Sequence, residues 1–266
     1  MNPESLIAGN EITVTFGRGL EKFDAVHRAT INASIGETVG VVGESGSGKT
    51  TLARVLVGLQ KPTHGSVWFE GYQILGAKSK TKITRDDRWK IQMVFQDPYS
   101  SLNPRLRAWE AVAEAVQVWD KKDKEEAKEH AFWILNSVGI SNEQAKHFPR
   151  SLSGGQRQRV SVARALAARP KVLIADEPSS SIDQSAQAQL LNLLRRIQED
   201  CDLTIIFISH DLGIINYLTD RVYVMKKGKI VESGLTRKVF FQPEHPYTQL
   251  LINSIPGRSK TTTVTG

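Results

Sequence analysis

The chain has 266 residues, of which 40% are hydrophobic, so it can bury one large core or two small ones, and a disordered chain is excluded. Its net charge of +7 is compatible with attraction to nucleic acid or to an anionic membrane face, and the basic residues are too dispersed along the chain to favour one of these partners. One cysteine excludes an internal disulfide framework, and apolar runs far shorter than the roughly 20 residues of a membrane span lead us to expect a soluble cytoplasmic protein.

Short apolar runs bounded by turn residues predict that the first hundred residues are mainly strands. We expect strands at 11–16, 29–35, 38–42 and 66–69, and a further strand that ends at Gln96. From Leu106 to about Gly139 the apolar period becomes helical. The charged run 121–126 within that region is interpreted as a solvated helix start.

A glycine-rich loop lies between the strand at 38–42 and a helix expected over 51–57. It reads Gly43-Glu44-Ser45-Gly46-Ser47-Gly48-Lys49-Thr50 and is followed by Thr51, which fits the pattern G-x-x-x-x-G-K-[ST]. Glycines let successive N–H groups point at phosphate oxygens, and the following helix adds its positive end. Lys49 can then bridge the β- and γ-phosphates, and the Thr50 hydroxyl can ligate Mg²⁺.

A second glycine motif, Leu152-Ser153-Gly154-Gly155-Gln156, follows about a hundred residues later. Ser153 can cap the next helix, and Gly154 and Gly155 allow backbone N–H groups to approach an anion. The first loop already has its own partners, so we expect this helix start to serve a nucleotide held by another subunit. The prediction is a head-to-tail dimer with ATP between its two chains.

The second half of the chain alternates strands and helices. Strands are expected at 172–175, 203–208 and 221–225, and helices at 157–169, 184–199 and 212–218, with Cys201 near a helix end. This alternation predicts a largely parallel sheet covered by helices. The interpretation is an α/β core interrupted by a helical insert near 97–150.

Polar residues follow three of these strands at the sheet edge where α/β folds bind ligands. Asp176 is expected to support Mg²⁺ and Glu177 to polarise an attacking water, although an acidic turn before Pro178 would look the same. His210 can bond a γ-phosphate oxygen, although a histidine after a strand is more often structural. Gln96 is expected to touch both Mg²⁺ and the insert.

This set of motifs resembles the nucleotide-binding subunit of ABC transporters over nearly the whole chain. The resemblance makes 43–50 Walker A, 172–176 Walker B, Glu177 the catalytic glutamate, Gln96 the Q-loop residue and His210 the switch histidine. It makes 152–156 the signature and 180–183 the D-loop, which adds Asp183 to the nucleotide contacts. Phe16 is expected to stack on adenine, with Phe23 as its competitor.

The resemblance implies a P-loop NTPase core with an N-terminal antiparallel β-subdomain and an inserted α-helical subdomain. One nucleotide-binding domain would cover 1–256. Its expected parts are a core at 1–96 and 151–235, the insert at 97–150, a C-terminal helical extension at 236–256 and, beyond the domain, a flexible tail at 257–266. ATP and Mg²⁺ are the expected ligands.

Two segments, 95–105 and 243–251, look like the oligopeptide, dipeptide and nickel importer group. That group implies two permease subunits, a second ATP-binding subunit, an extracytoplasmic binding protein acting indirectly, and a peripheral place on the cytoplasmic face of the inner membrane. Many of its peptide importers carry a C-terminal cysteine cluster that this chain lacks. No iron–sulfur cluster is therefore expected, and nickel importers remain open.

Three other kinds of protein share parts of this pattern: an ABC-type ATPase acting on nucleic acid or ribosomes, an exporter cassette and a non-hydrolysing binding module. We expect no nucleic-acid partner, because the chain lacks a second cassette, a long coiled coil and zinc-binding cysteines. Tyr99, Leu102 and Leu106 are expected to form a permease docking surface or to pack the insert's own core. The cargo, and whether the dimer pairs identical chains, cannot be read from the sequence.

Overall fold

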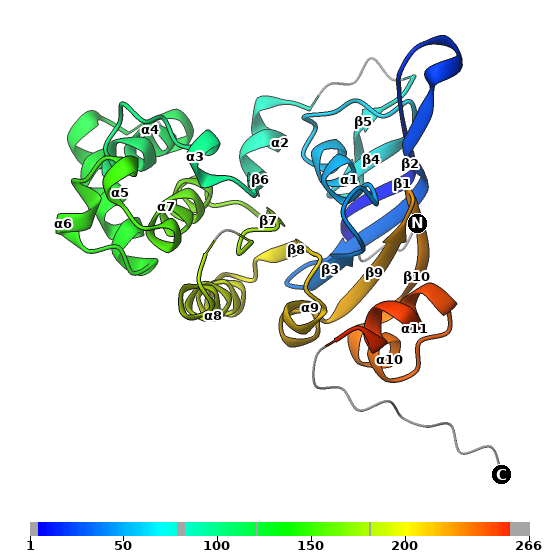
Figure 1. Ribbon diagram of the computed structural model, residues 1–266. Coiled ribbons are helices and arrows are strands. Elements are labelled where there is room, and N and C mark those ends of the chain that lie inside the picture. Colours follow the sequence, from blue (N-terminus) through cyan, green and yellow to red (C-terminus); the bar gives the residue numbers. More distant parts are fainter. Residues whose placement is uncertain (1–4, 79–82, 121, 181, 256–266) are drawn as a thin grey trace.

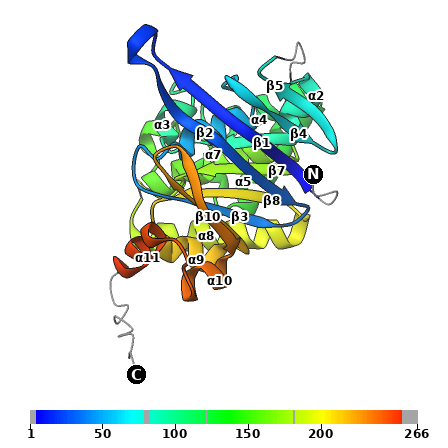
Figure 2. The same cartoon turned by 90° about the vertical axis from the view of Figure 1, so that its right-hand side faces the viewer.

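The computed structural model describes residues 5–78, 83–120, 122–180 and 182–255. The expected tail at 257–266 and Ser181 of the expected D-loop lie outside these residues. The described strands form two sheets (Figures 1 and 2). Sheet A is antiparallel in the order β2-β1-β4-β5, and its strands are β1 Ser5–Phe16, β2 Phe23–Ser34, β4 His64–Phe69 and β5 Tyr72–Gly76.

Sheet B contains the strands that the sequence analysis expected to end at one common edge. Its order is β10-β9-β3-β8-β7-β6, with parallel pairing throughout except between β9 and β10. The strands are β3 Thr38–Val42, β6 Ile91–Val94, β7 Val172–Asp176, β8 Thr204–Ser209, β9 Arg221–Lys226 and β10 Lys229–Leu235. The predicted parallel α/β core is confirmed.

Alternate residues of sheet B face two separate cores, as the two-residue period of a strand requires. On β8, Ile206 and Ile208 belong to the core shared with sheet A, whereas Ile205 and Phe207 belong to the core on the opposite face. Helix α1, Lys49–Leu56, packs between the two sheets through Leu52, Val55 and other apolar residues. The sheet therefore needs apolar residues on both faces, which explains its continuous apolar strands.

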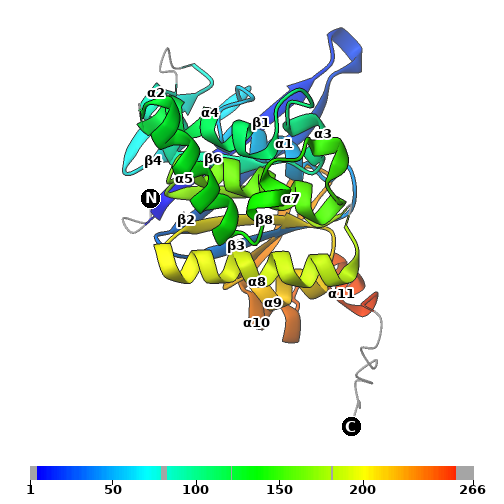
Figure 3. The same ribbon diagram turned by 90° about the vertical axis from the view of Figure 1, so that its left-hand side faces the viewer.

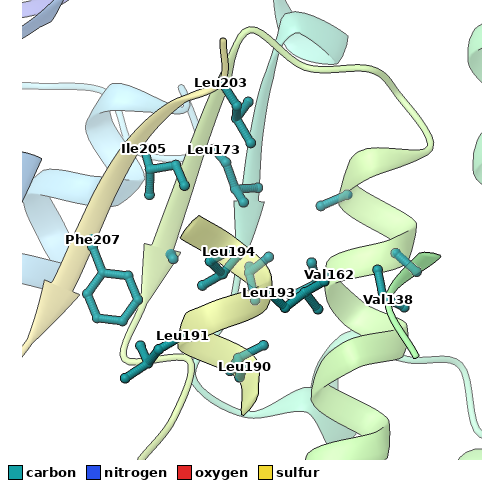
Figure 4. Packing of buried hydrophobic residues seen from close by; sticks show 14 of the residues in the cluster. Val138, Val162, Leu173, Leu190, Leu191, Leu193, Leu194, Leu203, Ile205 and Phe207 are labelled. Carbon is teal, nitrogen blue, oxygen red and sulfur yellow. The ribbon is translucent and has the colours of Figure 1, made fainter. Parts of the chain in front are cut away.

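Helices cover the outer face of sheet B (Figure 3). Leu191 and Leu194 of α8 face Phe207 and Leu173 of the sheet (Figure 4). Helices α3 to α6 form a separate group that follows β6 and contacts α7 (Figure 1). The remaining helices are α2 Arg85–Lys90, α3 Pro98–Ser101, α4 Ala108–Asp120, α5 Lys124–Ser137, α6 Asn142–Ala145, α7 Gly154–Leu166, α8 Gln184–Cys201, α9 Leu212–Leu218, α10 Thr236–Phe241 and α11 Pro246–Asn253, with 3-10 turns at Gly19–Glu21 and Pro149–Ser151.

Several expected elements had wrong limits. β1 begins at Ser5 and not at residue 11, because a bulge with Glu11 at φ +47° carries the strand past its polar centre. The helix expected over 157–169 is α7, which begins at Gly154 and ends at Leu166 before Arg169 at φ +48° and Pro170. Strands β5 and β10 and helix α2 were not predicted. Cys201 does end a helix, and it is exposed.

None of the described helices combines the length and apolar character that a membrane crossing requires.

Glu70, the residue after β4, ties sheet A to sheet B. Its carboxylate accepts a hydrogen bond from Lys90 Nζ at 2.9 Å and another from Lys171, which precedes β7. The bond from Lys171 lowers the pKa of Glu70 most, burial opposes that, and the bond from Lys90 lowers the pKa further. The ionised carboxylate is therefore favoured in the folded protein.

Glu70→Gln should lower the free energy of unfolding at pH 7 by about 1 kcal/mol, because one partly exposed carboxylate holds two lysines. The folded-state pKa lies below the ordinary 4.5, so this contribution is present above pH 4.5 and is lost as the pH falls through the lower folded value. Urea unfolding from pH 7 to pH 4 and below measures it. Glu125→Gln, in an exposed pair on α5, is the control, and equal losses in both variants would contradict the role of Glu70.

Candidate functional site

The glycine-rich loop joins β3 to α1 at the carboxyl edge of sheet B, and close neighbours leave no room for a side chain at two of its glycines, Gly43 and Gly48. Gly48 has φ +102°, and a Cβ there would lie 2.3 Å from the carbonyl oxygen of Ala25. A Cβ on Gly43 would lie 2.2 Å from the carbonyl oxygen of Met225. The Gly228 N–H donates to the Ser47 carbonyl at 2.9 Å. Strand β2 and the β9–β10 turn therefore hold the loop against the sheet.

A cleft of about 560 Å³ opens over this loop. The sequence predicted most of its walls, but Asp24, Ala25, Lys227 and Gly228 were missed because they come from the β1–β2 and β9–β10 hairpins, which carry no motif. Phe16 and Phe23 lie side by side, with ring centroids 6.0 Å apart, and both border the cleft. The predicted residues that line it are Phe16, Ser45, Gly46, Ser47, Gly48, Lys49, Thr50, Thr51, Gln96 and Glu177.

The Lys49 side chain is buried and points across the start of its own loop. Its ammonium donates to the carbonyl oxygens of Gly43 at 2.7 Å and Glu44 at 3.0 Å, and lies 3.8 Å from Glu177 Oε1. Burial lowers the pKa of Lys49, and the attraction of Glu177 and Asp176 opposes that shift. An added negative charge in the cleft would favour the charged ammonium.

Asp176 ends β7 beside the start of α1. The Thr50 hydroxyl donates to Asp176 Oδ1 at 3.1 Å. Burial raises the pKa of Asp176, the bond from Thr50 lowers it, and the charge of Glu177 raises it again. A nearby cation would therefore stabilise the ionised carboxylate.

Glu177 is the centre of the site. Its Oε2 lies 3.1 Å from His210 Nδ1 and accepts a hydrogen bond from Gln96 Nε2 at 3.3 Å, while Oε1 faces Lys49. The residue has φ +45°, and its N–H donates to the Ile208 carbonyl of β8 at 2.9 Å. A strained backbone of this kind persists only where its surroundings hold it, as at functional sites.

The strand register explains why these residues meet. Val42 pairs with Ser209, and Asp176 pairs with Ile208, so the loop, the carboxylates and His210 leave the sheet side by side. Gln96 follows β6, the neighbour of β7. The sequence predicted this common edge, but it did not predict that His210 and Gln96 would both contact Glu177 directly.

A second pocket of about 410 Å³ adjoins the cleft. Gly43, Glu44, Ser45, Glu177 and His210 border it together with Leu251 of α11. The sequence did not predict Leu251 as part of the site, because segment 243–251 indicated only a resemblance to the oligopeptide, dipeptide and nickel importer group.

The second glycine motif lies outside both pockets. Ser153 Oγ accepts from the Gln156 N–H at 3.2 Å, and Gln156 Oε1 accepts from the Ser153 N–H at 2.8 Å, so the predicted cap is present. Asp183 caps α8 through the Ala186 N–H at 2.8 Å. A Cβ on Gly155 would lie 2.8 Å from that of Ala186, so the starts of α7 and α8 touch. None of Ser153, Gly154, Gly155, Gln156 and Asp183 is among the described residues that line either pocket.

The expected docking group divides in two. Leu102 is only 2% exposed and belongs to the same core as Val112 and Val116, so of its two expected roles it has the core one and does not lie on a docking surface. It faces inward because α3 lies on α7, which buries its apolar side. Tyr99 is 54% exposed, and the Arg157 guanidinium lies 4.1 Å from its ring centroid. Leu106 is half-buried.

Comparison with known proteins agrees with this geometry. Residues 26–180 match the family model described as ABC transporter. The chain is 43% identical over 254 residues to the oligopeptide transport ATP-binding protein AmiF of Streptococcus pneumoniae, covering 95% of this chain and 82% of AmiF. It is 45% identical over 222 residues to OppF of Bacillus subtilis, covering 83% of this chain and 72% of OppF.

Solved structures show the same fold. The dimeric post-hydrolysis state of the ATP-binding cassette MJ0796, bound to ADP and phosphate, has a TM-score of 0.77 and 29% identity, covering 87% of this chain and 99% of that one. CbiO1 of Clostridium perfringens, part of the transporter complex cbiONQ, has a TM-score of 0.76 and 27% identity, covering 90% and 92%. The expected P-loop NTPase fold is confirmed.

Lys49→Ala should abolish nucleotide binding, because its ammonium is the buried cation beside the loop and the phosphate charge would lose its partner. Titration of a fluorescent ATP analogue measures the affinity. Lys229→Ala removes an exposed lysine and should bind as the wild type does. An unchanged affinity in Lys49→Ala would show that nucleotide binds elsewhere.

Proposed function

The chain belongs to the ABC transporter family and is an ATP-binding, ATP-hydrolysing member of it, and from this premise we propose that it powers a membrane importer of peptides. The observation that carries the ATPase assignment is the position of Glu177. Its carboxylate lies between the buried ammonium of Lys49, the amide of Gln96 and the imidazole of His210. The named relatives carry the peptide assignment and favour it over the nickel complexes that the sequence left open.

The residues around the cleft divide the work of binding and hydrolysing ATP. The loop N–H groups from Gly46 to Thr51 and the Lys49 ammonium bind the β- and γ-phosphates. Glu177 holds the attacking water and takes its proton. His210, whose Nδ1 lies 3.1 Å from Glu177 Oε2, donates to a γ-phosphate oxygen. Phe16 offers its exposed face to adenine, with Phe23 as its neighbour.

The residues beside the loop fit Mg²⁺, which prefers oxygen ligands and retains several waters when it binds with a nucleotide. The described residues hold no cluster of three or more acidic, histidine or cysteine ligands, and a magnesium shared with phosphates needs none. Thr50 Oγ1 and the Gln96 side-chain oxygen would be its direct protein ligands, with Asp176 holding Thr50 in place. When bound, Mg²⁺ neutralises charge on the phosphates.

The second anion site is assigned to a partner chain. Ser153, Gly154, Gly155 and Gln156 start α7, Asp183 starts α8, and these residues lie away from the chain's own cleft. In the proposed head-to-tail dimer they complete the cleft of the second ATP-binding subunit, which is either a second copy or a related chain. The dimeric structure of the ATP-binding cassette MJ0796 supports the formation of a dimer.

A role in transport also requires partner proteins. In this proposal the chain lies on the cytoplasmic face of the membrane, binds two permease subunits, and works indirectly with an extracytoplasmic binding protein, without nucleic acid. Tyr99, exposed on α3 just after Gln96, is the proposed permease contact. The absence of an iron–sulfur cluster stays a prediction that rests on the single cysteine of the chain.

Glu177→Gln should retain ATP binding while turnover falls about 10²–10⁴-fold, because the positioned base is removed. Phosphate release measures turnover, and size-exclusion chromatography with ATP should show a trapped dimer. Glu199→Gln, on the exposed face of α8, is the charge-matched control. Turnover within twofold of the wild type in Glu177→Gln would sink the assigned role.

Tyr99→Ser should leave basal ATPase of the isolated subunit and its melting temperature nearly unchanged, yet abolish transport by the assembled complex. The reason is that the ring lies on the surface, outside the lining of the cleft. Leu102→Ser is the contrasting variant and should lower the melting temperature, because it puts a hydroxyl into the core. Transport that survives in Tyr99→Ser would place the permease contact elsewhere.

A further inference from the structure

Helix α11 reaches the phosphate-binding loop from the C-terminal end of the chain. The hydroxyl of Tyr247 accepts a hydrogen bond from the backbone N–H of Glu44 at 3.2 Å. Tyr247 is only 4% exposed, and Leu251, one turn later on α11, borders the pocket that Glu177 and His210 also border. A C-terminal helix thus forms part of the wall beside the proposed γ-phosphate position.

The chain just before α11 is fastened to the sheet. Glu232 of β10 accepts hydrogen bonds from the N–H groups of Glu244 at 2.8 Å and His245 at 3.0 Å. His245 Nδ1 then accepts from the Tyr247 N–H at 3.1 Å and caps the helix. These bonds fix where α11 begins, and therefore where the Tyr247 ring enters the protein.

The ring itself is held by packing and charge. It belongs to the apolar core, and Lys226 Nζ of β9 lies 4.4 Å from its centroid. Burial raises the pKa of Tyr247, so the hydroxyl stays protonated at neutral pH. The group that meets Glu44 is thus a neutral hydroxyl on a rigid support.

The loop is held at two points by different elements. The β9–β10 turn binds Ser47 through the Gly228 N–H at 2.9 Å, and Tyr247 binds Glu44 near the beginning of the loop. A backbone N–H left without a partner in such a part-buried place costs free energy. Loop conformations that move Glu44 away from Tyr247 are disfavoured by that cost.

We infer that Tyr247 is a positioning residue for nucleotide binding, which holds the start of the phosphate-binding loop in its binding conformation from the C-terminal helix. This inference rests on the proposed function of the loop and adds a residue outside its motifs. Tyr247 acts through the backbone of Glu44, and the inference gives it no contact with the reacting atoms. Linkage requires the reverse effect as well: nucleotide binding should strengthen the docking of α11.

The chain contains a close internal control. The hydroxyl of Tyr223, on β9, accepts a hydrogen bond from the Asn32 N–H, also at 3.2 Å. Tyr223 is 5% exposed, and the Arg221 guanidinium lies 5.5 Å from its ring. The two tyrosines have similar burial, each accepts one backbone N–H and each has a neighbouring cation, and the Tyr223 hydroxyl also lies 3.4 Å from the Asn32 carbonyl and side-chain oxygens. Only the Tyr247 hydroxyl bonds the loop.

The experiment compares Tyr247→Phe with Tyr223→Phe in the full chain. Each variant keeps the ring and loses one hydroxyl, so both should lose a similar small amount of thermal stability. Tyr247→Phe should raise the KM for MgATP about three- to tenfold with kcat within twofold, since one hydrogen bond biases the loop. Tyr223→Phe should leave KM unchanged. An unchanged KM in Tyr247→Phe, or equal increases in both variants, would overturn the inference.

Hydrogen exchange of the nucleotide-free proteins separates this inference from the proposed function. The Glu44 amide should exchange faster in Tyr247→Phe than in the wild type or Tyr223→Phe, and an unchanged rate would show that the tether does not hold the loop. A wild type that neither binds nor hydrolyses MgATP would refute the proposed function, while Glu44 exchange would still report on the tether.

Discussion

The register of three parallel strands, β3, β8 and β7, positions the charged groups of the site. Val42 lies opposite Ser209 and Asp176 opposite Ile208, so the loop, the two carboxylates and His210 emerge at one level. The same strands alternate their side chains between two cores, and a slip by one residue would exchange the two sets. The apolar packing that stabilises the sheet therefore also fixes the geometry of the site.

Burial gives this edge its electrostatic character. It lowers the pKa of Lys49 and raises that of Asp176, so both groups are pushed toward their neutral forms. Glu177 is 15% exposed and shares its two oxygens among a lysine, a glutamine and a histidine. Such a site favours a ligand that brings both negative phosphate and a divalent cation. The phosphate would stabilise the charged form of Lys49, and the cation would stabilise the charged form of Asp176.

The sequence predicted the site better than its surroundings. Motif residues follow buried strands, and parallel strands end at one edge, so the meeting of 43–50 with Asp176, Glu177 and His210 could be derived. The limits of β1 could not be derived in this way, because the bulge at Glu11 depends on pairing with strands distant in the sequence. Leu102 and Tyr99 look alike in sequence, and only the packing of α3 on α7 separates a core residue from an exposed one. Tyr247 lies about 200 residues from the loop it touches, a contact that no local pattern encodes.

A short chain segment and a series of contacts connect the centre of the site to the second glycine motif. Gln96 bonds Glu177, Tyr99 follows three residues later, and its ring lies under Arg157. Arg157 in turn donates to the carbonyl oxygens of Pro149 and Leu152, just before the start of α7. A shift of Gln96 toward a bound phosphate would thus move the segment that contacts the start of α7. In the proposed dimer, that helix start faces the partner's nucleotide. These contacts pass through the exposed ring of Tyr99, the proposed permease contact. One small segment, 96–99, therefore lies where catalysis, dimer closure and membrane contact would meet.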